Sequence, residues 1–203
     1  MNWIIASAAI ATNALFGAQT TLVSDSASAK EVVQCCRSMI PSDVTLKGRV
    51  ILRNRRGISQ AEYGYQLDRH TGKTDLKLFK DGEEVPFDRS GRILKTDVTW
   101  SDITLDYLWW DDFRFDSEKE SESVHGQVCM VILLQKGERV VRVWVDRKTG
   151  ALMQAEELVS GKPVRRLWGT RIKKFGERWM ANVMEVETVG SGHRTKITVE
   201  EMK

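Results

Sequence analysis

Residues 99–115, TWSDITLDYLWWDDFRF, hold the densest group of side chains that could do chemistry in this 203-residue chain. Three of the seven tryptophans lie there among four aspartates: Trp100, Trp109, Trp110, Asp102, Asp106, Asp111 and Asp112. Paired carboxylates could serve acid–base catalysis, as in glycosidases, or bind a hard cation, and the tryptophans could form a sugar platform. A short helix that hides one apolar face is the simpler alternative.

The helical alternative accounts for most of these residues. Thr99 suits an N-cap, and Asp102 follows three residues later, close to a capping box. One helical stripe is apolar and consists of Trp100, Ile103, Tyr107 and Leu108. The pattern therefore predicts a short amphipathic helix over residues 99–108, with Ser101, Asp102 and Asp106 on its solvent side.

The remaining aspartates, Asp111 and Asp112, are adjacent in sequence, so on an extended segment they would point to opposite faces. No third acidic residue stands at a metal-like spacing from them. The three histidines lie near separate glycine-containing turns, and no GxSxG, HExxH, phosphate loop or CxxC motif occurs. The sequence predicts no enzyme, no metal site and no cofactor.

The cysteines leave two alternatives open. Adjacent Cys35 and Cys36 cannot easily ligate one tetrahedral zinc ion. In an exported protein one of them could form a disulfide with Cys129; otherwise all three are small buried hydrophobic residues.

The N-terminal end is apolar, because the first 24 residues contain no charged side chain. We expect residues 1–18 to form a signal peptide with an approximate cleavage point, and the protein to be periplasmic. The segment MNW lacks the usual basic residue, and a buried N-terminal helix is the alternative.

The rest of the chain reads as one domain over residues 26–203. A helix is predicted for residues 26–39, before Pro41, and then apolar residues alternate with polar ones. Residues 126–135 are apolar on both faces, as in a central strand, and short connections predict antiparallel neighbours. We expect nine or ten strands in a curled sheet with one buried face. The basic run 162–174 is interpreted as a solvated face, and no nucleic-acid binding is expected.

Several segments together resemble the outer-membrane lipoprotein-sorting family, the LolA-like proteins. They are TDVTWSDITLDYLWWDDFRF, HGQVCMVILL, RVVRVWVDRKTGALMQAEEL, RRLWGTRIKKFGERWM and TKITVEE, and the resemblance runs from about residue 30 to the C-terminus. It implies a mainly β (α+β) fold, in which a curled antiparallel sheet forms an unclosed half-barrel with helices as a lid over an apolar cavity. It also implies a non-enzymatic carrier of lipoprotein acyl chains or other lipids, with inner- and outer-membrane lipoprotein-handling proteins as partners.

The candidate lipid-binding residues follow from the apolar faces. On the lid they are Trp100, Ile103, Tyr107 and Leu108; on the sheet they are Val44, Leu46, Val50, Leu52, Val141, Val143, Val145, Ile197 and Val199. Each fits plain core packing equally well. The resemblance also implies a lid-latching arginine, for which Arg49, Arg53, Arg55 and Arg56 compete without a decision.

Two other functions remain open. One is a cell-envelope scaffold that binds no lipid. The other is a carbohydrate-active enzyme that uses Asp111 or Asp112 beside Trp109 and Trp110.

Overall fold

The computed structural model describes residues 26–70, 73–119 and 121–203, so the expected signal peptide lies outside the described residues. The elements in chain order are α1 (Ala29–Met39), β1 (Val44–Arg53), β2 (Ser59–His70), β3 (Lys73–Lys80), β4 (Glu83–Val85), α2 (Trp100–Thr104), the 3-10 helix η1 (Asp106–Trp109), β5 (Asp112–Phe115), β6 (Ser121–Val124), β7 (Gln127–Lys136), β8 (Arg139–Asp146), β9 (Leu152–Val159), β10 (Lys162–Phe175), β11 (Arg178–Thr188) and β12 (Arg194–Met202).

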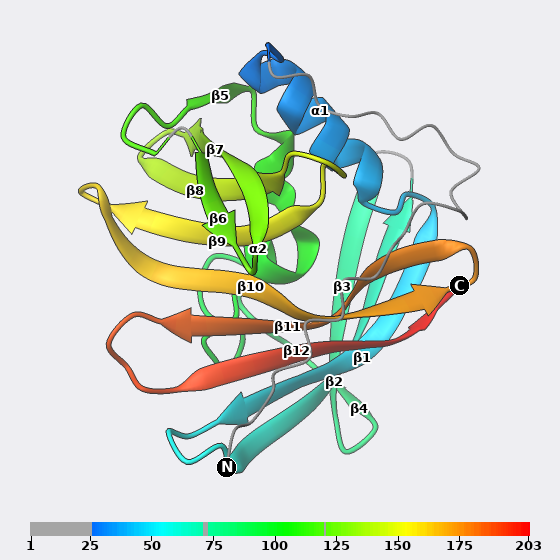
Figure 1. Ribbon diagram of the computed structural model, residues 1–203. Helices are drawn as coiled ribbons and strands as arrows, with labels where there is room; N and C mark the ends of the chain where they lie inside the picture. Colours follow the sequence, from blue (N-terminus) through cyan, green and yellow to red (C-terminus); the bar gives the residue numbers. More distant parts are fainter. Residues whose placement is uncertain (1–25, 71–72, 120) are drawn as a thin grey trace, which may run out of the picture.

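One antiparallel sheet of twelve strands makes up the body of the protein (Figure 1). Its order is β4-β3-β2-β1-β12-β11-β10-β9-β8-β7-β5, with β6 paired to β7. The first and last strands pair with each other, so the two ends of this order, β4 and β5, come from the middle of the chain. The sheet curls but does not close, which confirms the predicted mainly β, unclosed half-barrel.

The strand count exceeds the nine or ten expected. The sequence interpretation missed short strands on either side of the tryptophan-rich segment: β4 has 3 residues, and β5 and β6 have 4 each. Strands this short carry too few residues to show a period-two pattern. The antiparallel arrangement is confirmed, since neighbouring strands pair antiparallel throughout the described ladders, although the connection from β4 to β5 is long and contains α2 and η1.

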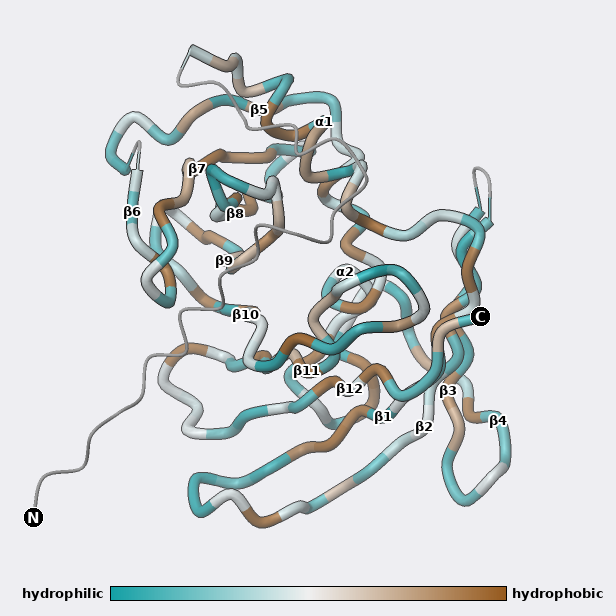
Figure 2. The backbone as a smooth tube through the Cα atoms, turned by 45° about the vertical axis from the view of Figure 1, so that its right-hand side comes forward, coloured by the Kyte–Doolittle hydropathy of each residue, from teal (hydrophilic) through white to brown (hydrophobic). Residues whose placement is uncertain are grey.

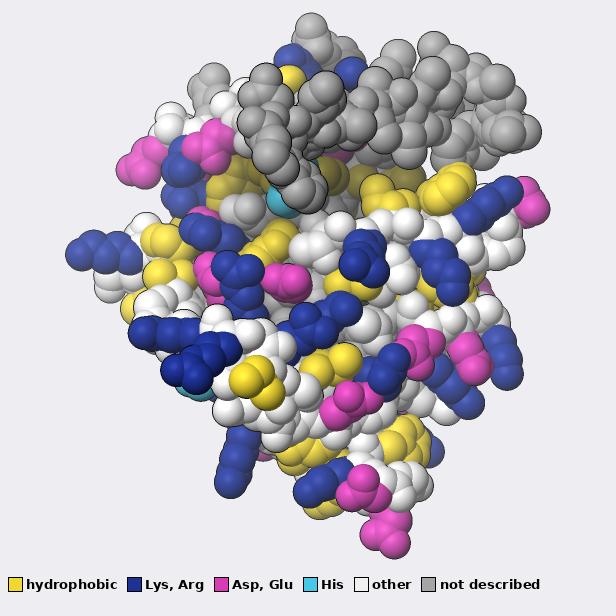
Figure 3. All heavy atoms as spheres, turned by 60° about the horizontal axis from the view of Figure 1, so that its bottom comes forward, with side chains coloured by type: hydrophobic (Ala, Val, Ile, Leu, Met, Phe, Trp, Pro, Cys, Tyr) yellow, Lys and Arg dark blue, Asp and Glu magenta, His cyan; other side chains and the backbone are white. Residues whose placement is uncertain are grey.

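The main core lies on the concave face of the sheet and is covered by α1, α2, η1 and the loop that precedes α2. Figure 2 shows hydrophobic and hydrophilic residues alternating along several strands, as a sheet with one covered face requires. Buried residues from all these elements join one cluster, in which Val33 of α1, Leu108 of η1, Val50 of β1 and Val143 of β8 are each 0% exposed. On the face drawn in Figure 3, hydrophobic side chains form only small patches between charged ones.

Strand β8 is buried on both of its faces. Arg142, Trp144 and Asp146 alternate with the valines along β8, and all three are buried. Two carboxylates contact this outer face: Asp116 accepts a hydrogen bond from Arg142 Nε at 2.5 Å, and Glu122 accepts one from Trp144 Nε1 at 2.8 Å. The outer side of β8 therefore has a second, smaller core.

A close approach between β1 and β12 requires a glycine. The register shifts between Lys47 and Gly48, and a Cβ at position 48 would lie 1.7 Å from the carbonyl oxygen of Thr198. No side chain fits there without separation of the strands that join the two ends of the chain.

Helix α1 begins at a capping box, in which the side chain of Glu31 accepts a hydrogen bond from the N–H of Ser28 at 2.7 Å.

All three cysteines have free thiols. Cys36 packs in the main core and Cys129 in the second one, so the disulfide alternative is wrong and the buried-residue alternative describes these two. Among the described residues, none of the helices has the length and apolar character needed to cross a membrane.

Candidate functional site

The segment of residues 99–110, here called the α2–η1 segment, lies over the concave face of the sheet. The single helix predicted for residues 99–108 is wrong in one respect, because Leu105 adopts the left-handed conformation (φ 55°, ψ 31°) and separates α2 from η1. Ile103, Tyr107 and Leu108 nevertheless point into the main core. Trp100 is only half-buried and stacks on Phe87, with ring centroids 6.3 Å apart.

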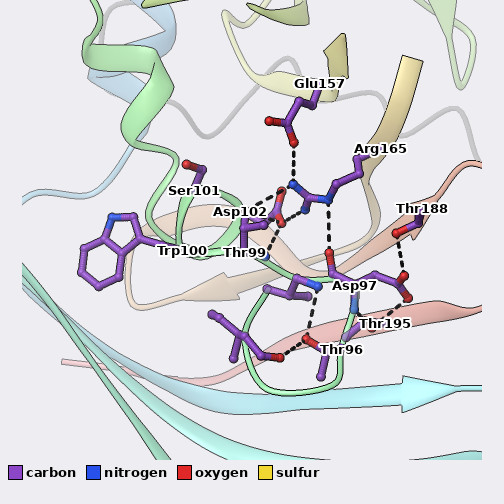
Figure 4. A network of polar contacts seen from close by, with 12 residues as sticks. Thr96, Asp97, Thr99, Trp100, Ser101, Asp102, Glu157, Arg165, Thr188 and Thr195 are labelled. Atoms are coloured by element: carbon purple, nitrogen blue, oxygen red, sulfur yellow. Dashed lines mark hydrogen bonds and ion pairs between the residues drawn. The ribbon is translucent and has the colours of Figure 1, made fainter. Parts of the chain in front are cut away.

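Asp102 does not face solvent as the helical pattern predicted; it is 8% exposed and paired with Arg165 of β10 (Figure 4). Its carboxylate also accepts hydrogen bonds from the N–H and the hydroxyl of Thr99, at 2.6 and 2.9 Å, so the predicted capping role is confirmed. The guanidinium of Arg165 reaches further, to Glu157 at 2.9 Å and to the carbonyl oxygen of Asp97 at 3.2 Å.

Burial and charge act in opposite directions on this pair. Burial raises the pKa of the Asp102 carboxyl, while Arg165 and the Thr99 donors lower it, and the pKa stays above its ordinary value. For Arg165, burial lowers the pKa, but Asp102 and Glu157 together raise it by more. Arg165 therefore stays charged, and Asp102 depends on it to remain an anion in this buried position.

Hydrogen bonds join the loop before α2 to strands β11 and β12 of the sheet. The carboxylate of Asp97, which is 3% exposed, accepts hydrogen bonds from the hydroxyls of Thr188 at 2.8 Å and Thr195 at 3.3 Å (Figure 4). The N–H of Asp97 donates to Thr195 Oγ1 at 3.0 Å. Asp97 thus holds the start of the α2–η1 segment against β11 and β12.

Two further arginines donate to backbone carbonyls of the α2–η1 segment. Arg69 of β2 donates to the carbonyl oxygen of Thr104 at 2.5 Å, and burial lowers the pKa of this arginine. Arg37 of α1 donates to the carbonyl oxygens of Leu108 at 2.5 Å and Trp110 at 3.0 Å. The carbonyls at the ends of these two short helices find partners in these arginines.

A small cavity adjoins the segment on the β8–β10 side. Its volume is about 20 Å³, room for about one water molecule. The hydroxyl of Tyr107, which lines it, is buried and has no hydrogen-bond partner within the described part of the chain. Arg139 of β8 lines it too and donates to Ser101 Oγ at 3.1 Å. Several ionisable side chains line this cavity, and its volume is too small for an acyl chain.

None of the four arginines considered as a latch contacts the α2–η1 segment in the interactions described. Arg49 lies on the outer face, where it pairs with Glu62 at 2.9 Å and Glu200 at 2.5 Å. Arg37, Arg69, Arg139 and Arg165 make those contacts instead, and the sequence interpretation missed them. The sequence did contain a signal for two of them, because residues two positions apart on a strand lie on the same face. Arg69 follows buried Leu67 by two positions, and Arg165 precedes buried Leu167 by two. The run 162–174 is therefore not a wholly solvated face.

The structure brings most of the candidate lipid-binding residues together on the concave side. Eleven of them are buried in the main core: Ile103, Tyr107, Leu108, Val44, Leu46, Val50, Val141, Val143, Val145, Ile197 and Val199. Leu52 is half-buried, like Trp100. Whether any of them touches lipid stays a prediction.

The residues considered for catalysis do not converge. Asp111 and Asp112 are exposed, and Trp109 is 45% exposed while Trp110 is buried. His70 ends β2, His125 lies in the β6–β7 turn and His193 in the β11–β12 turn. In the described ranges, no group of three or more acidic, cysteine or histidine side chains could hold a metal ion.

Comparison with solved structures finds the same fold in proteins from several bacteria. A LolA superfamily protein from Nitrosomonas europaea is 16% identical, with a TM-score of 0.63 over 87% of this chain and 93% of that one. A DUF1329 family protein from Desulfovibrio piger is also 16% identical, with a TM-score of 0.64 over 87% and 92%. A Vibrio parahaemolyticus domain assigned to outer membrane lipoprotein sorting is 14% identical, with a TM-score of 0.59 over 85% and 90%.

These likenesses concern the fold. No curated protein matches the chain in sequence. A family model described as "Uncharacterized protein" matches residues 85–203, which is more than half of the chain. The chain therefore belongs to this family, and its fold is that of the LolA superfamily and the lipoprotein-sorting domains.

Proposed function

We propose that the protein is a non-enzymatic carrier that binds the acyl chains of lipoproteins or other lipids against the concave face of the sheet. The α2–η1 segment serves as the lid over this face. The protein moves its cargo through the periplasm toward the outer membrane, between inner- and outer-membrane lipoprotein-handling proteins. The periplasmic location rests on the expected signal peptide at residues 1–18 and on the lipoprotein-sorting description of the Vibrio domain.

The observation that carries this proposal is how the lid is held. Its apolar stripe (Ile103, Tyr107 and Leu108) lies on an aliphatic face, while its polar groups contact arginines of α1, β2, β8 and β10. When the lid opens, water can replace each arginine contact, and an acyl chain can replace the apolar stripe against the sheet. Burying acyl chain gains about 0.8 kcal/mol per CH₂, which offsets the exposure of the lid.

A scaffold without lipid is the second candidate, and one observation favours it. The concave face is filled by the protein's own side chains, and the cavity beside the lid has a volume of only about 20 Å³. Carrier and scaffold differ in whether the lid leaves that face. Asp111 and Asp112 lie exposed and apart from any other candidate catalytic group, so nothing favours the carbohydrate-active enzyme.

The test is the titration of a fluorescent fatty-acyl probe into three forms of the protein. The wild type should bind the probe saturably, at a site that unlabelled fatty acid competes for. Arg69→Met removes the hydrogen bond to the carbonyl oxygen of Thr104 and should therefore favour the open lid. If the open lid is the state that binds the probe, a larger open population raises the apparent affinity. A loss of about 1.4 kcal/mol from the closed state would raise that affinity about tenfold.

Arg49→Met is the matched control, because this arginine also pairs at short distance but on the exposed outer face. It should leave the affinity for the probe unchanged. If neither the wild type nor Arg69→Met binds the probe saturably, while circular dichroism shows both folded, the carrier proposal fails and the scaffold is favoured.

A further inference from the structure

Strands β10 and β11 continue beyond their neighbours as a two-stranded arm. β9 pairs with β10 only as far as Trp168, and β12 pairs with β11 only from Val183 onward. In the described ladders, the partners of residues 169–182, here called the β10–β11 arm, all belong to β10 or β11. The arm is at the right-hand side of Figure 1.

One face of the arm is fixed to the protein and the other is free. Phe175 is 8% exposed, and it and Met180 pack on the main core, which holds a hairpin that would be only marginally stable alone. Side chains alternate between the two faces of a strand, so Ile172 and Trp179 lie on the opposite face. They are 71% and 51% exposed, and Lys174 is the cross-strand partner of Trp179.

The arm is also strongly basic. Residues 171–179, RIKKFGERW, contain four cations and one carboxylate. The cations are all exposed: Arg171, Lys173, Lys174 and Arg178. The carboxylate, Glu177, lies 3.6 Å from Lys174 and extends into solvent.

Protection of the unpaired strand edges accounts for only part of this composition. Lysine on an edge strand discourages pairing with other chains, so the cations alone could serve that purpose. Exposed Trp179 and Ile172 work against it, because an apolar edge promotes association. Tryptophan beside lysine and arginine is instead the combination that settles at the interface between a bilayer and water.

We propose that the β10–β11 arm is a docking surface for an anionic phospholipid bilayer. Trp179 and Ile172 enter the headgroup region, and Lys174, which shares their face, contacts the lipid phosphates. Arg171, Lys173 and Arg178 are also exposed and add positive charge close to the bilayer surface. This inference goes beyond the proposed function, because docking requires neither an open lid nor a bound acyl chain.

Co-sedimentation with vesicles tests the arm on the protein as it is recovered from its host. We expect binding to vesicles of equal parts phosphatidylcholine and phosphatidylglycerol, and little binding to phosphatidylcholine alone. Binding should weaken as salt is added, since exposed charges are screened. Ile172→Ser with Trp179→Ser should weaken it about tenfold or more, from the lost apolar burial.

A second variant keeps the test independent of folding. Lys173→Gln with Lys174→Gln alters only exposed side chains and should weaken binding about fivefold for each charge removed. Val159→Ser is the control, because Val159 is 59% exposed at the end of β9, outside the arm, and this change should leave vesicle binding as in the wild type. Quenching of wild-type fluorescence by brominated lipid should exceed that of Trp179→Phe.

Equal binding to neutral and anionic vesicles would overturn the proposal, as would full binding by both arm variants. Self-association that disappears in the Ile172→Ser, Trp179→Ser protein would show that the arm contacts a second copy instead, and would also overturn it. The arm variants should still bind the soluble acyl probe, so a failure of docking is distinguishable from a failure of the carrier function.

Discussion

Removal of Arg165 should leave Asp102 as an unpaired charge in the interior. The two side chains are 10% and 11% exposed, and after Arg165→Met only the N–H and hydroxyl of Thr99 would still donate to the carboxylate. Removing one partner of a buried ion pair costs about 3–5 kcal/mol, and loss of the contact with partly exposed Glu157 adds at most about 1 kcal/mol. We therefore expect a loss of about 3–5 kcal/mol in the free energy of unfolding near pH 8.

The loss of stability should depend on pH, because protonation of the Asp102 carboxylate removes the unpaired charge. Burial already raises the pKa of this carboxyl in the folded protein, and without Arg165 the pKa rises further. When the folded-state pKa of an acid is raised, stability falls as pH rises from the unfolded-state pKa through the folded-state pKa, by up to about 1.4 kcal/mol per pH unit, and is level above it. Arg165→Met should therefore be less destabilised, relative to wild type, at pH 5 than at pH 8.

Urea denaturation followed by tryptophan fluorescence measures these changes, and a second substitution sharpens the test. Asp102→Asn combined with Arg165→Met leaves no charge in the site and should cost only about 1–3 kcal/mol, independent of pH. Arg49→Met, an arginine 48% exposed that pairs with two carboxylates, should cost at most about 1 kcal/mol. Equal costs of Arg165→Met at both pH values, with no recovery in the double variant, would show that Asp102 is not left as an unpaired buried charge.

Three other predictions concern the fold and the unused carboxylates. Gly48→Ala should destabilise the protein by about 1–3 kcal/mol, because its Cβ would meet the Thr198 carbonyl; Gly64→Ala, whose Cβ would lie 3.6 Å from Phe79, should cost less in the same urea experiment. Burial raises the pKa of Cys36 to about 12 and that of Cys129 to about 11, so at pH 8 both thiols should react with Ellman's reagent far more slowly in the folded protein than in urea; equal rates would contradict their burial. Asp111→Asn and Asp112→Asn should leave acyl-probe binding unchanged, and a loss of binding by a folded variant would show that these residues have a function.

The pattern of alternating residues predicts which side chains form the core. Val44, Leu46 and Val50 of β1 and the three valines of β8 were assigned to one face each, and the structure buries them in one core. Period-two alternation shows which residues share a face, because successive side chains of a strand point to opposite sides of the sheet. The apolar face is the one that must be covered. The pairing of β1 with β12 is a different matter, since short connections predict hairpins but not which distant strands meet.

The contacts of the α2–η1 segment were beyond a local pattern. Asp102 and Arg165 are 63 positions apart, and each was assigned to solvent from its own helix or run. A carboxylate at the third position of a helix caps its N-terminus equally well whether it also faces water or a buried arginine. The break at Leu105 was hidden for another reason, because a leucine rarely adopts a positive φ and no residue type marked the position.

The occupancy of the interior is the most direct test of the carrier function. A native mass spectrum of the protein purified gently from its host envelope, with lipid extraction of the same sample, reports what the concave face holds. A carrier should show adducts whose masses correspond to acyl-bearing molecules, and these should be lost on denaturation and recovered as fatty acids in the extract. A folded protein whose mass is that of the polypeptide alone, with no acyl species in the extract, would contradict the carrier function.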